Sequence, residues 1–323
     1  MRRLLAGLAA GAVLAALPAC GSSGSDRTEP ADEGPAGVTT VEVGIIPIVD
    51  VAPLYLGEKQ GFFEERGLRL SLSPAQGGAA IVPGVVSGQF QFGFSNMTSL
   101  MVAQSSGVPV KAVVNGASSS GVEGEDFGGL MVKKGSPVKS PKELEGRKVA
   151  VNTLKNINET AVRNSVRQDG GDPDEVQLVE LAFDQMPAAL ESGQVDAAMV
   201  VEPALATIKA QGGTEIASSL VDIADELTVA MYFTSAQYAQ DNPELVQAFQ
   251  EATAESLAYA DAHPDEVRAI VTTYTKIPAA TLERVTLPKW PAEANRASVE
   301  ALRELGEEDG FFRETPDLDA LLP

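Results

Sequence analysis

The sequence predicts an α/β protein with two similar lobes and a ligand-binding cleft between them. The main observation is a stretch that occurs twice, as IVPGVVSGQFQFGFSN over residues 81–96 and as MPAALESGQVDAAMVV over residues 186–201. The shared Ser-Gly-Gln begins at Ser87 and again at Ser192, 105 positions later. In each copy a helical apolar pattern ends at Ser-Gly, where glycine suits the positive φ of a helix C-terminus, and a short apolar strand follows.

The segments in front of each copy match as well. Apolar strands are predicted over residues 68–73 (LRLSLS) and 176–181 (VQLVEL), before the two copies. Earlier strands are predicted over residues 41–47 and 148–153, and a helical segment follows each. The chain thus contains two βαβαβ-like halves, which favours two lobes over one sheet. One long doubly wound sheet with a chance internal similarity is the alternative.

Two segments are expected to carry the chain between the lobes. Residues 126–135 leave lobe one, and the apolar, strand-like residues 227–235 return to it. A pair of segments that joins two lobes forms a natural hinge. From Pro243 onward the pattern is helical, and we expect this tail to pack on lobe one. The predicted division is residues 39–127 with 228–323 for lobe one, and residues 128–227 for lobe two.

The first 19 residues have the features of an export signal. The start is positively charged, and the apolar run from Leu4 to Leu17 is shorter than the roughly 20 residues that span a bilayer. The run ends Leu-Pro-Ala-Cys-Gly, which resembles a bacterial lipobox with Cys20 as the acylated residue. Residues 20–38 are predicted to form a flexible tether. This pattern implies an extracytoplasmic, lipid-anchored protein; a plain secretory signal with a spare thiol at Cys20 is the alternative.

The composition excludes several classes of function. The chain has 45 acidic and 24 basic residues, a formal net charge of −21, which argues against nucleic acid or an anionic lipid surface as a partner. Cys20 is the single cysteine, so no internal disulfide can form. The single histidine, His263, lies at a predicted helix boundary and is expected at the surface. No phosphate-binding glycine loop or calcium loop is present in the sequence, and we expect no catalytic residue, metal or cofactor.

Polar residues follow the predicted strands and begin the next helices. In a two-lobed α/β fold, ligands bind at these strand ends and helix starts. Each such residue could instead be a helix cap or a turn residue. The positions singled out as candidate ligand contacts are Asp50, Gly77, Gly78, Ser95, Asn96, Met97, Asn152, Asn158, Glu159, Thr160 and Glu202.

Several motifs together resemble a known family. They are VAPLYLGEKQGFFEERGL (residues 51–68), GGAAIVPGVVSGQFQFGF, GVPVKAV, SPKELEGRKVAVN and MPAALESGQVDAAMVVEP. They are similar to substrate-binding proteins of nitrate-, sulfonate- and taurine-type ABC transporters, a family that includes binders of pyrimidine precursors of thiamine. The resemblance runs from about residue 41 to the C-terminus.

The resemblance implies a class-II periplasmic-binding-protein fold that closes on one small molecule and presents it to an ABC permease. A monomer is usual in this family. The positions that match its motifs and would line the cleft are Asp50, Gly78, Ser95, Asn96, Asn152, Asn158 and Glu202, with Tyr232 beside the hinge. A lipoprotein sensor, or less favourably an enzyme on the same fold, is the alternative function.

The sequence leaves the ligand open. Helix N-termini at Gly78, Ser95 and Asn158 could hold an anion such as a sulfonate or nitrate. Asp50 and Glu202 would instead add negative charge, and no arginine is among the candidate contacts to offset it. We therefore expect a ligand with hydrogen-bond donors, such as an amine or aminopyrimidine. The alternative for Glu202 is that it caps the helix that follows Pro203.

Overall fold

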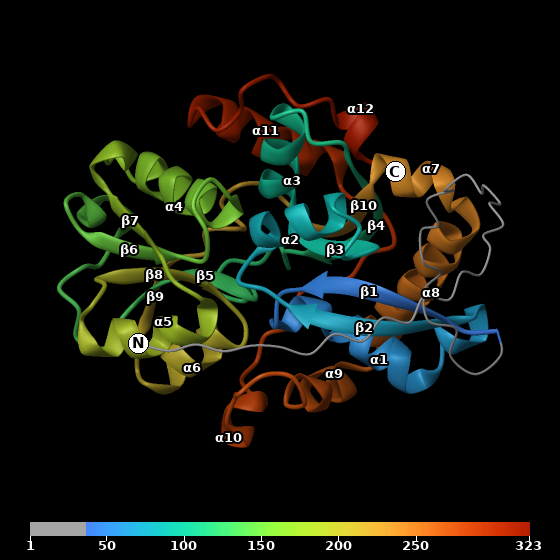
Figure 1. Cartoon of the computed structure of the whole chain (residues 1–323). Coiled ribbons are helices and arrows are strands. Elements are labelled where there is room, and N and C mark those ends of the chain that lie inside the picture. The colour runs from blue at the N-terminus through green and yellow to red at the C-terminus, as the bar shows by residue number, and fades with distance from the viewer. Residues whose placement is uncertain (1–36) are drawn as a thin grey trace, which may run out of the picture. The chain divides into compact units, whose positions relative to one another are not determined.

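The computed structural model describes residues 37–323, which fall within one compact unit. They form two separate five-stranded mixed sheets, each covered by helices (Figure 1). We call the half built on the first sheet lobe one and the half built on the second sheet lobe two. The alternative of one long doubly wound sheet is therefore wrong. The predicted signal, Cys20 and most of the predicted tether lie outside the described residues.

The sheet of lobe one contains three parallel strands and two that run against them. β1 pairs in parallel with β2 and β3, and β10 pairs antiparallel with β3 and β4. In spatial order the strands are β2 (Leu68–Pro74), β1 (Thr39–Ile45), β3 (Phe92–Asn96), β10 (Thr228–Ser235) and β4 (Val110–Ser118).

The sheet of lobe two repeats this arrangement. β6 pairs in parallel with β7 and β8, and β5 pairs antiparallel with β8 and β9. In spatial order the strands are β7 (Gln177–Glu180), β6 (Lys148–Val151), β8 (Ala197–Val201), β5 (Gly128–Val132) and β9 (Thr214–Ala217). In both sheets the fourth place is taken by a strand that has crossed from the other lobe.

The duplicated stretch occupies equivalent places in the two sheets. β3 and β8 are the third strands, and their bounds differ by the same 105 positions as the sequence copies. The glycine after each preceding helix has positive φ, +79° at Gly88 and +75° at Gly193. A residue with a side chain would be strained at either position, so the Ser-Gly signal at both helix ends has the expected backbone cause.

Two helix boundaries bear on the site. α1 ends before Gly61, whose φ is +89°, and a short 3-10 turn follows. In lobe two α4 begins at Ile157, so Asn158 to Thr160 form its first turn. The helices of lobe one before the tail are η1 (Val49–Val51), α1 (Ala52–Gln60), η2 (Glu64–Arg66), α2 (Gly78–Val86) and α3 (Met97–Ser105).

The helices of lobe two surround its smaller sheet, and three of the six are short 3-10 turns. Among residues 37–323 no helix has the length and apolar character needed to cross a membrane. The lobe-two helices are η3 (Pro141–Leu144), α4 (Ile157–Gln168), η4 (Pro173–Glu175), η5 (Phe183–Gln185), α5 (Met186–Ser192) and α6 (Ala204–Ala210).

The helical tail contacts both lobes. α8 packs on β4 and α1, and α9 packs on α1, as expected for a tail on lobe one. α11 packs on α3 of lobe one but also on α4 of lobe two, and α10 contacts α6. The expectation of a tail confined to lobe one is therefore incomplete. The tail helices are α7 (Ala236–Asp241), α8 (Pro243–Ala262), α9 (Pro264–Val271), α10 (Ala279–Leu282), α11 (Arg296–Glu308) and α12 (Leu318–Leu321).

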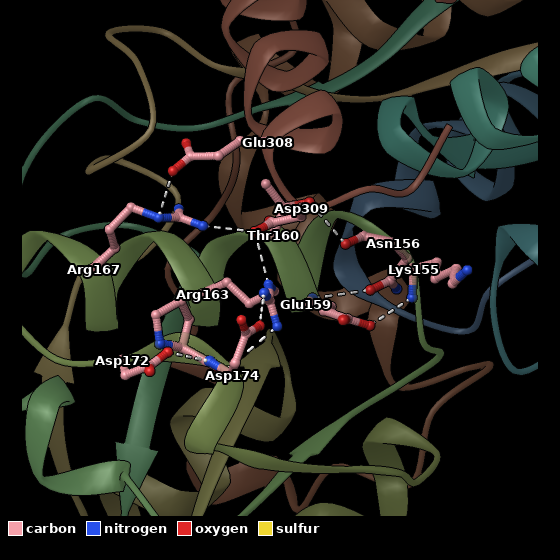
Figure 2. Close-up of polar contacts among 11 residues, drawn as sticks. Lys155, Asn156, Glu159, Thr160, Arg163, Arg167, Asp172, Asp174, Glu308 and Asp309 are labelled. Atoms are coloured by element: carbon pink, nitrogen blue, oxygen red, sulfur yellow. Dashed lines mark hydrogen bonds and ion pairs between the residues drawn. The ribbon is translucent and has the colours of Figure 1, made fainter. Parts of the chain in front are cut away.

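Charged side chains join the end of α11 to α4 (Figure 2). Arg163 and Arg167, one turn apart on α4, both donate to Oδ1 of Asp309, at N–O distances of 2.8 and 2.6 Å. Arg167 also pairs with Glu308 at 2.9 Å. The side chain of Asp309 is 0% exposed, against 79% for Asp174, which pairs with Arg163 from within lobe two. We call the Arg163–Arg167–Asp309 group the arginine bridge.

The arginine bridge should contribute to stability because its carboxylate is fully buried. We expect Asp309→Asn to lower the free energy of unfolding by roughly 1–3 kcal/mol, since two partly buried guanidinium groups lose their shared counter-charge. Asp174→Asn removes an exposed, solvent-screened partner of the same Arg163 and should cost clearly less than Asp309→Asn. Urea denaturation of the two variants measures the difference, and equal losses would contradict this account.

Candidate ligand-binding site

Three groups of predicted site residues lie where lobe one meets lobe two. One surrounds Asp50, after the end of β1; a second contains asparagines from both lobes; the third is Glu202, after the end of β8. Val49, next to Asp50, donates its backbone N–H to the carbonyl of Glu202 at 3.1 Å, which joins the two lobes at this point. The described residues contain no group of three or more His, Cys, Asp or Glu side chains placed to hold a metal ion.

Asp50 is buried with an unused acceptor. It lies in η1 and is 1% exposed. Its carboxylate oxygen Oδ1 has no hydrogen-bond partner among the described residues. Its backbone carbonyl accepts from the indole Nε1 of Trp290 at 3.2 Å. The segment before α11 thus covers the end of β1 with the one tryptophan of the chain.

Two tyrosines, Tyr232 and Tyr274, lie close enough to Asp50 to feel its charge, and a third, Tyr55, stacks on Tyr274. The hydroxyl of Tyr232, on β10, is buried and has no partner. Tyr55 and Tyr274 stack with ring centroids 4.0 Å apart, and the Tyr274 hydroxyl donates to the carbonyl of Ile48 at 3.1 Å. We call Asp50 and these three tyrosines the carboxyl–tyrosine cluster. Sequence analysis placed Asp50 and Tyr232 at the site and missed the other two.

The carboxyl–tyrosine cluster has strongly perturbed ionisation. Burial, with a smaller contribution from the negative charge of Asp126, raises the pKa of Asp50 to about 7 against a lowering by its own backbone N–H. Burial and the Asp50 charge hold the pKa of Tyr232 well above its usual range, and burial does the same for Tyr274. The Asp126 carboxylate accepts hydrogen bonds from the hydroxyl of Ser119 and from the backbone N–H groups of Ser120 and Phe127.

An asparagine network connects the two lobes. The side chain of Gln76 donates to the carbonyl of Asn152 at 2.7 Å, and the backbone N–H of Ile157 donates to Oδ1 of Asn96 at 3.3 Å. Asn156 and Asn158 both donate to Oδ1 of Asn152, at 2.5 and 2.9 Å. We call Gln76, Asn96, Asn152, Asn156 and Asn158 the amide cluster. Asn156, which sequence analysis did not single out, is the N-cap residue of α4.

The two predicted glycines make close contacts of different kinds. A Cβ at Gly78 would lie 1.9 Å from the hydroxyl of Ser95, so within lobe one a side chain would not fit. A Cβ at Gly77 would lie 2.9 Å from Thr153 and 3.0 Å from the Asn152 amide, both in lobe two. Gly77, whose φ of −172° is ordinary extended backbone, is therefore small because the other lobe approaches it.

The helix starts at the boundary already have partners for several backbone N–H groups. Oδ1 of Asn96 caps α3 by accepting from Ser99, with Met97 buried as the first helical residue. Oδ1 of Asn156 accepts from Asn158 and Glu159, and the Thr160 hydroxyl donates to the Asn156 carbonyl. The carboxylate of Glu159 accepts from the backbone N–H of Lys155 at 2.7 Å (Figure 2). Glu159 and Thr160 thus support the start of α4.

Glu202 makes the contacts of a structural carboxylate. Its two oxygens accept backbone N–H groups, one from Ala206 in the first turn of α6 at 2.9 Å and the other from Thr286 of the tail at 3.0 Å. Burial raises its pKa to about 7 although these hydrogen bonds lower it. The contact with Ala206 is the one expected from the alternative interpretation, in which Glu202 caps the helix that follows Pro203.

Residues that sequence analysis missed come mostly from distant segments. Tyr274 and Trp290 belong to the tail and reach Asp50 across more than 200 positions. Their rarity could have indicated these residues, because the chain has five tyrosines and one tryptophan. Such side chains carry a polar group that needs a hydrogen-bond partner when it is buried. His263, in contrast, is exposed at the boundary of α8 and α9, as predicted.

The buried Asp50 should make stability depend on pH. Its folded-state pKa of about 7 exceeds the ordinary value of 3.8, so the folded protein binds a proton that the unfolded chain has lost between these values. The free energy of unfolding therefore falls as pH rises through this window. We expect Asp50→Asn to raise the melting temperature at pH 8 and to change it little at pH 4; the shift corresponds to at most about 4 kcal/mol. Parallel melting curves across pH would contradict this.

The comparisons with known proteins agree on one family. A model of the family described as NMT1/THI5 like matches residues 48–267. The taurine-binding periplasmic protein of Escherichia coli is 26% identical over 204 residues, which cover 63% of this chain and 61% of the relative. A putative aliphatic sulfonates-binding protein of Bacillus subtilis is 21% identical over 259 residues, covering 79% of this chain and 74% of the relative.

Similarity extends to a yeast protein named as an enzyme and to solved structures. A 4-amino-5-hydroxymethyl-2-methylpyrimidine phosphate synthase of Saccharomyces cerevisiae is 21% identical over 225 residues, covering 66% of this chain and 64% of the relative. The ligand-binding component of an ABC-type import system from Staphylococcus aureus superposes with a TM-score of 0.76 at 16% identity, covering 88% of this chain and 96% of that chain. The fold is therefore the two-lobed periplasmic-binding-protein fold that the resemblance implied. Since the family model spans strands of both sheets and more than half of the 323 residues, the chain belongs to the NMT1/THI5-like family.

Proposed function

We propose that this protein is the extracytoplasmic solute-binding component of an ABC importer. It closes its two lobes on a small molecule and delivers that molecule to a membrane permease. The observation that carries the proposal is the boundary between the lobes, where polar side chains from both sheets meet beside two crossing strands. Such a boundary can trap a ligand when the lobes rotate about the crossings.

Similar proteins support this function. The family match covers both lobes, and the bacterial relatives are named for binding taurine and aliphatic sulfonates. The ligand contacts that we propose are those predicted from the sequence apart from Glu202, and among them Asp50, Gly77, Asn96, Asn152 and Asn158 meet at the lobe boundary. Glu202 then serves as a hinge support, since its carboxylate is already fully engaged.

The N-terminal segment supports a membrane-anchored position. The apolar run and the Leu-Pro-Ala-Cys-Gly sequence favour cleavage before Cys20 and acylation of its thiol. Residues 20–38 would then tether the lobes, divided as the sequence predicts, outside the membrane. We propose that the protein acts as a monomer.

Two other functions remain as alternatives. A lipoprotein sensor would bind its ligand in the same way and pass the signal to a membrane kinase; co-purification with a permease separates the two roles. An enzyme on this fold is suggested by the yeast relative. It is less favoured because the single histidine, His263, stacks on Tyr259 at the surface, away from the lobe boundary.

Closure of the lobes should depend on the absence of a side chain at position 77. A thermal-shift screen against nitrate, alkanesulfonates, taurine, amines and pyrimidines first identifies a ligand; at 100 times its dissociation constant, a ligand stabilises by about 2.7 kcal/mol. We expect Gly77→Ala to weaken binding of that ligand by about tenfold, because its Cβ would meet Thr153 and Asn152 of lobe two. Calorimetric titration measures the loss.

A compensating variant controls for this effect. Thr153→Ala removes the nearest contact atom, so Gly77→Ala combined with Thr153→Ala should recover part of the affinity. Full affinity in Gly77→Ala would show that ligand binding does not require this approach of the lobes.

Membrane attachment should depend on Cys20. We expect the full-length protein expressed in a bacterium to incorporate radiolabelled palmitate and to sediment with membranes. Cys20→Ser removes the thiol that would be acylated, so the label should be lost and the protein should move to the soluble extracytoplasmic or secreted fraction. A Cys20→Ser protein that still sediments with membranes would contradict a lipid anchor at this residue.

A further inference from the structure

Several buried polar atoms around the lobe boundary lack hydrogen-bond partners. They include hydroxyls such as those of Thr98, Thr153 and Tyr232, which can donate or accept. Two others, Oδ1 of Asp50 and Oδ1 of Asn115, can only accept. Asp50 and Asn115 both contact one tail segment, since Trp290 donates to the Asp50 carbonyl and Asn115 donates to the carbonyl of Pro291. A buried acceptor without a donor costs free energy, so each such atom indicates a missing partner.

The donors at the same boundary are largely occupied. The first backbone N–H groups of α4 donate to Asn96 and Asn156, and Ser99 in the first turn of α3 donates to Asn96. An anion that used these helix N-termini would have to displace side-chain caps. Lys155, the basic residue beside the amide cluster, is exposed. The boundary therefore offers free oxygens that only accept, together with free hydroxyls that can serve either way, whereas its backbone donors are occupied.

The charge around Asp50 also disfavours an anion. The charged group that acts on Asp50 is a second acid, Asp126, and no lysine or arginine within residues 37–323 forms an ion pair with Asp50. Tyr232 and Tyr274 are the tyrosines on which the charge of Asp50 acts. A nitrate or sulfonate group would be repelled here, whereas a positively charged or N–H-rich group would relieve the buried carboxylate.

We propose that the ligand presents an N–H-bearing nitrogen group, an amine or amidine, to Oδ1 of Asp50, with the hydroxyl of Tyr232 as a second contact. This assignment rests on the proposed solute-binding function and names the chemical class of its ligand. An ammonium or amidinium donates several hydrogen bonds and carries the opposite charge, so it satisfies Asp50 and the free oxygen of Tyr232 together. The rest of the ligand lies toward the amide cluster.

The test uses pairs of probes that differ in the nitrogen group alone. Taurine is compared with isethionate, in which a hydroxyl replaces the ammonium, and 4-aminopyrimidine is compared with pyrimidine. Ethanesulfonate, which has no nitrogen, and nitrate, which has no N–H, represent simple anions. Binding to the full protein is measured by calorimetric titration. We expect the amino member to bind at least tenfold more tightly than its partner in at least one pair.

Variants then assign that preference to Asp50. Asp50→Asn should reduce affinity for the amino probe at least tenfold, and Tyr232→Phe, which removes one hydroxyl, should reduce it several-fold. The matched control is Glu58→Gln, another carboxyl-to-amide change, on α1, where Oε1 accepts from the backbone of Leu70 away from the boundary. It should leave affinity unchanged. Thermal denaturation checks that each variant is folded.

The possible outcomes separate the ligand class from the receptor function. Tighter binding of isethionate, ethanesulfonate or nitrate than of the amino probes overturns the nitrogen-group assignment and leaves a solute receptor for anions. Unchanged affinity of the amino probe in Asp50→Asn overturns the role of Asp50. If no probe of either class binds, both the ligand class and the solute-binding proposal are contradicted.

Discussion

Each sheet of this protein is completed by a strand that arrives from the other lobe. β10 lies between β3 and β4 in lobe one, and β5 lies between β8 and β9 in lobe two. Both crossing strands are hydrogen-bonded on two sides, so neither can leave its sheet without breaking two ladders. This pairing places a hinge between the lobes at the ends of these strands, next to Asp126 and Glu202, and not within the sheets.

The lobe boundary combines firm supports with a few unsatisfied atoms. Glu202, Asn96 and Asn156 hold backbone N–H groups and fix the geometry of the helices around them. In contrast, Oδ1 of Asp50 and the hydroxyl of Tyr232 are buried without hydrogen-bond partners. A binding protein benefits from this division, because rigid supports position the few groups whose desolvation is compensated only when a ligand arrives.

The tail adds a contact between the lobes that the two crossings do not supply. α11 packs on α3, and its end is held by Arg163 and Arg167 of lobe two through the buried Asp309. Because charged pairs with a fully buried member lose much of their solvation, separating them is costly unless water reaches both partners. The arginine bridge thus favours the arrangement of the lobes in which α4 and α11 are in contact.

The sequence by itself determined the duplicated halves, the strand and helix order, and the positions of the boundary glycines and asparagines, because these depend on local periodicity and backbone conformation. The family and fold implied by its motifs are confirmed. Tertiary structure alone decided that Tyr274 and Trp290 join Asp50, that Glu202 is occupied by Ala206 and Thr286, and that α11 reaches lobe two. These contacts link segments far apart in the chain, and no local pattern of residues encodes which distant partner a buried polar group will meet.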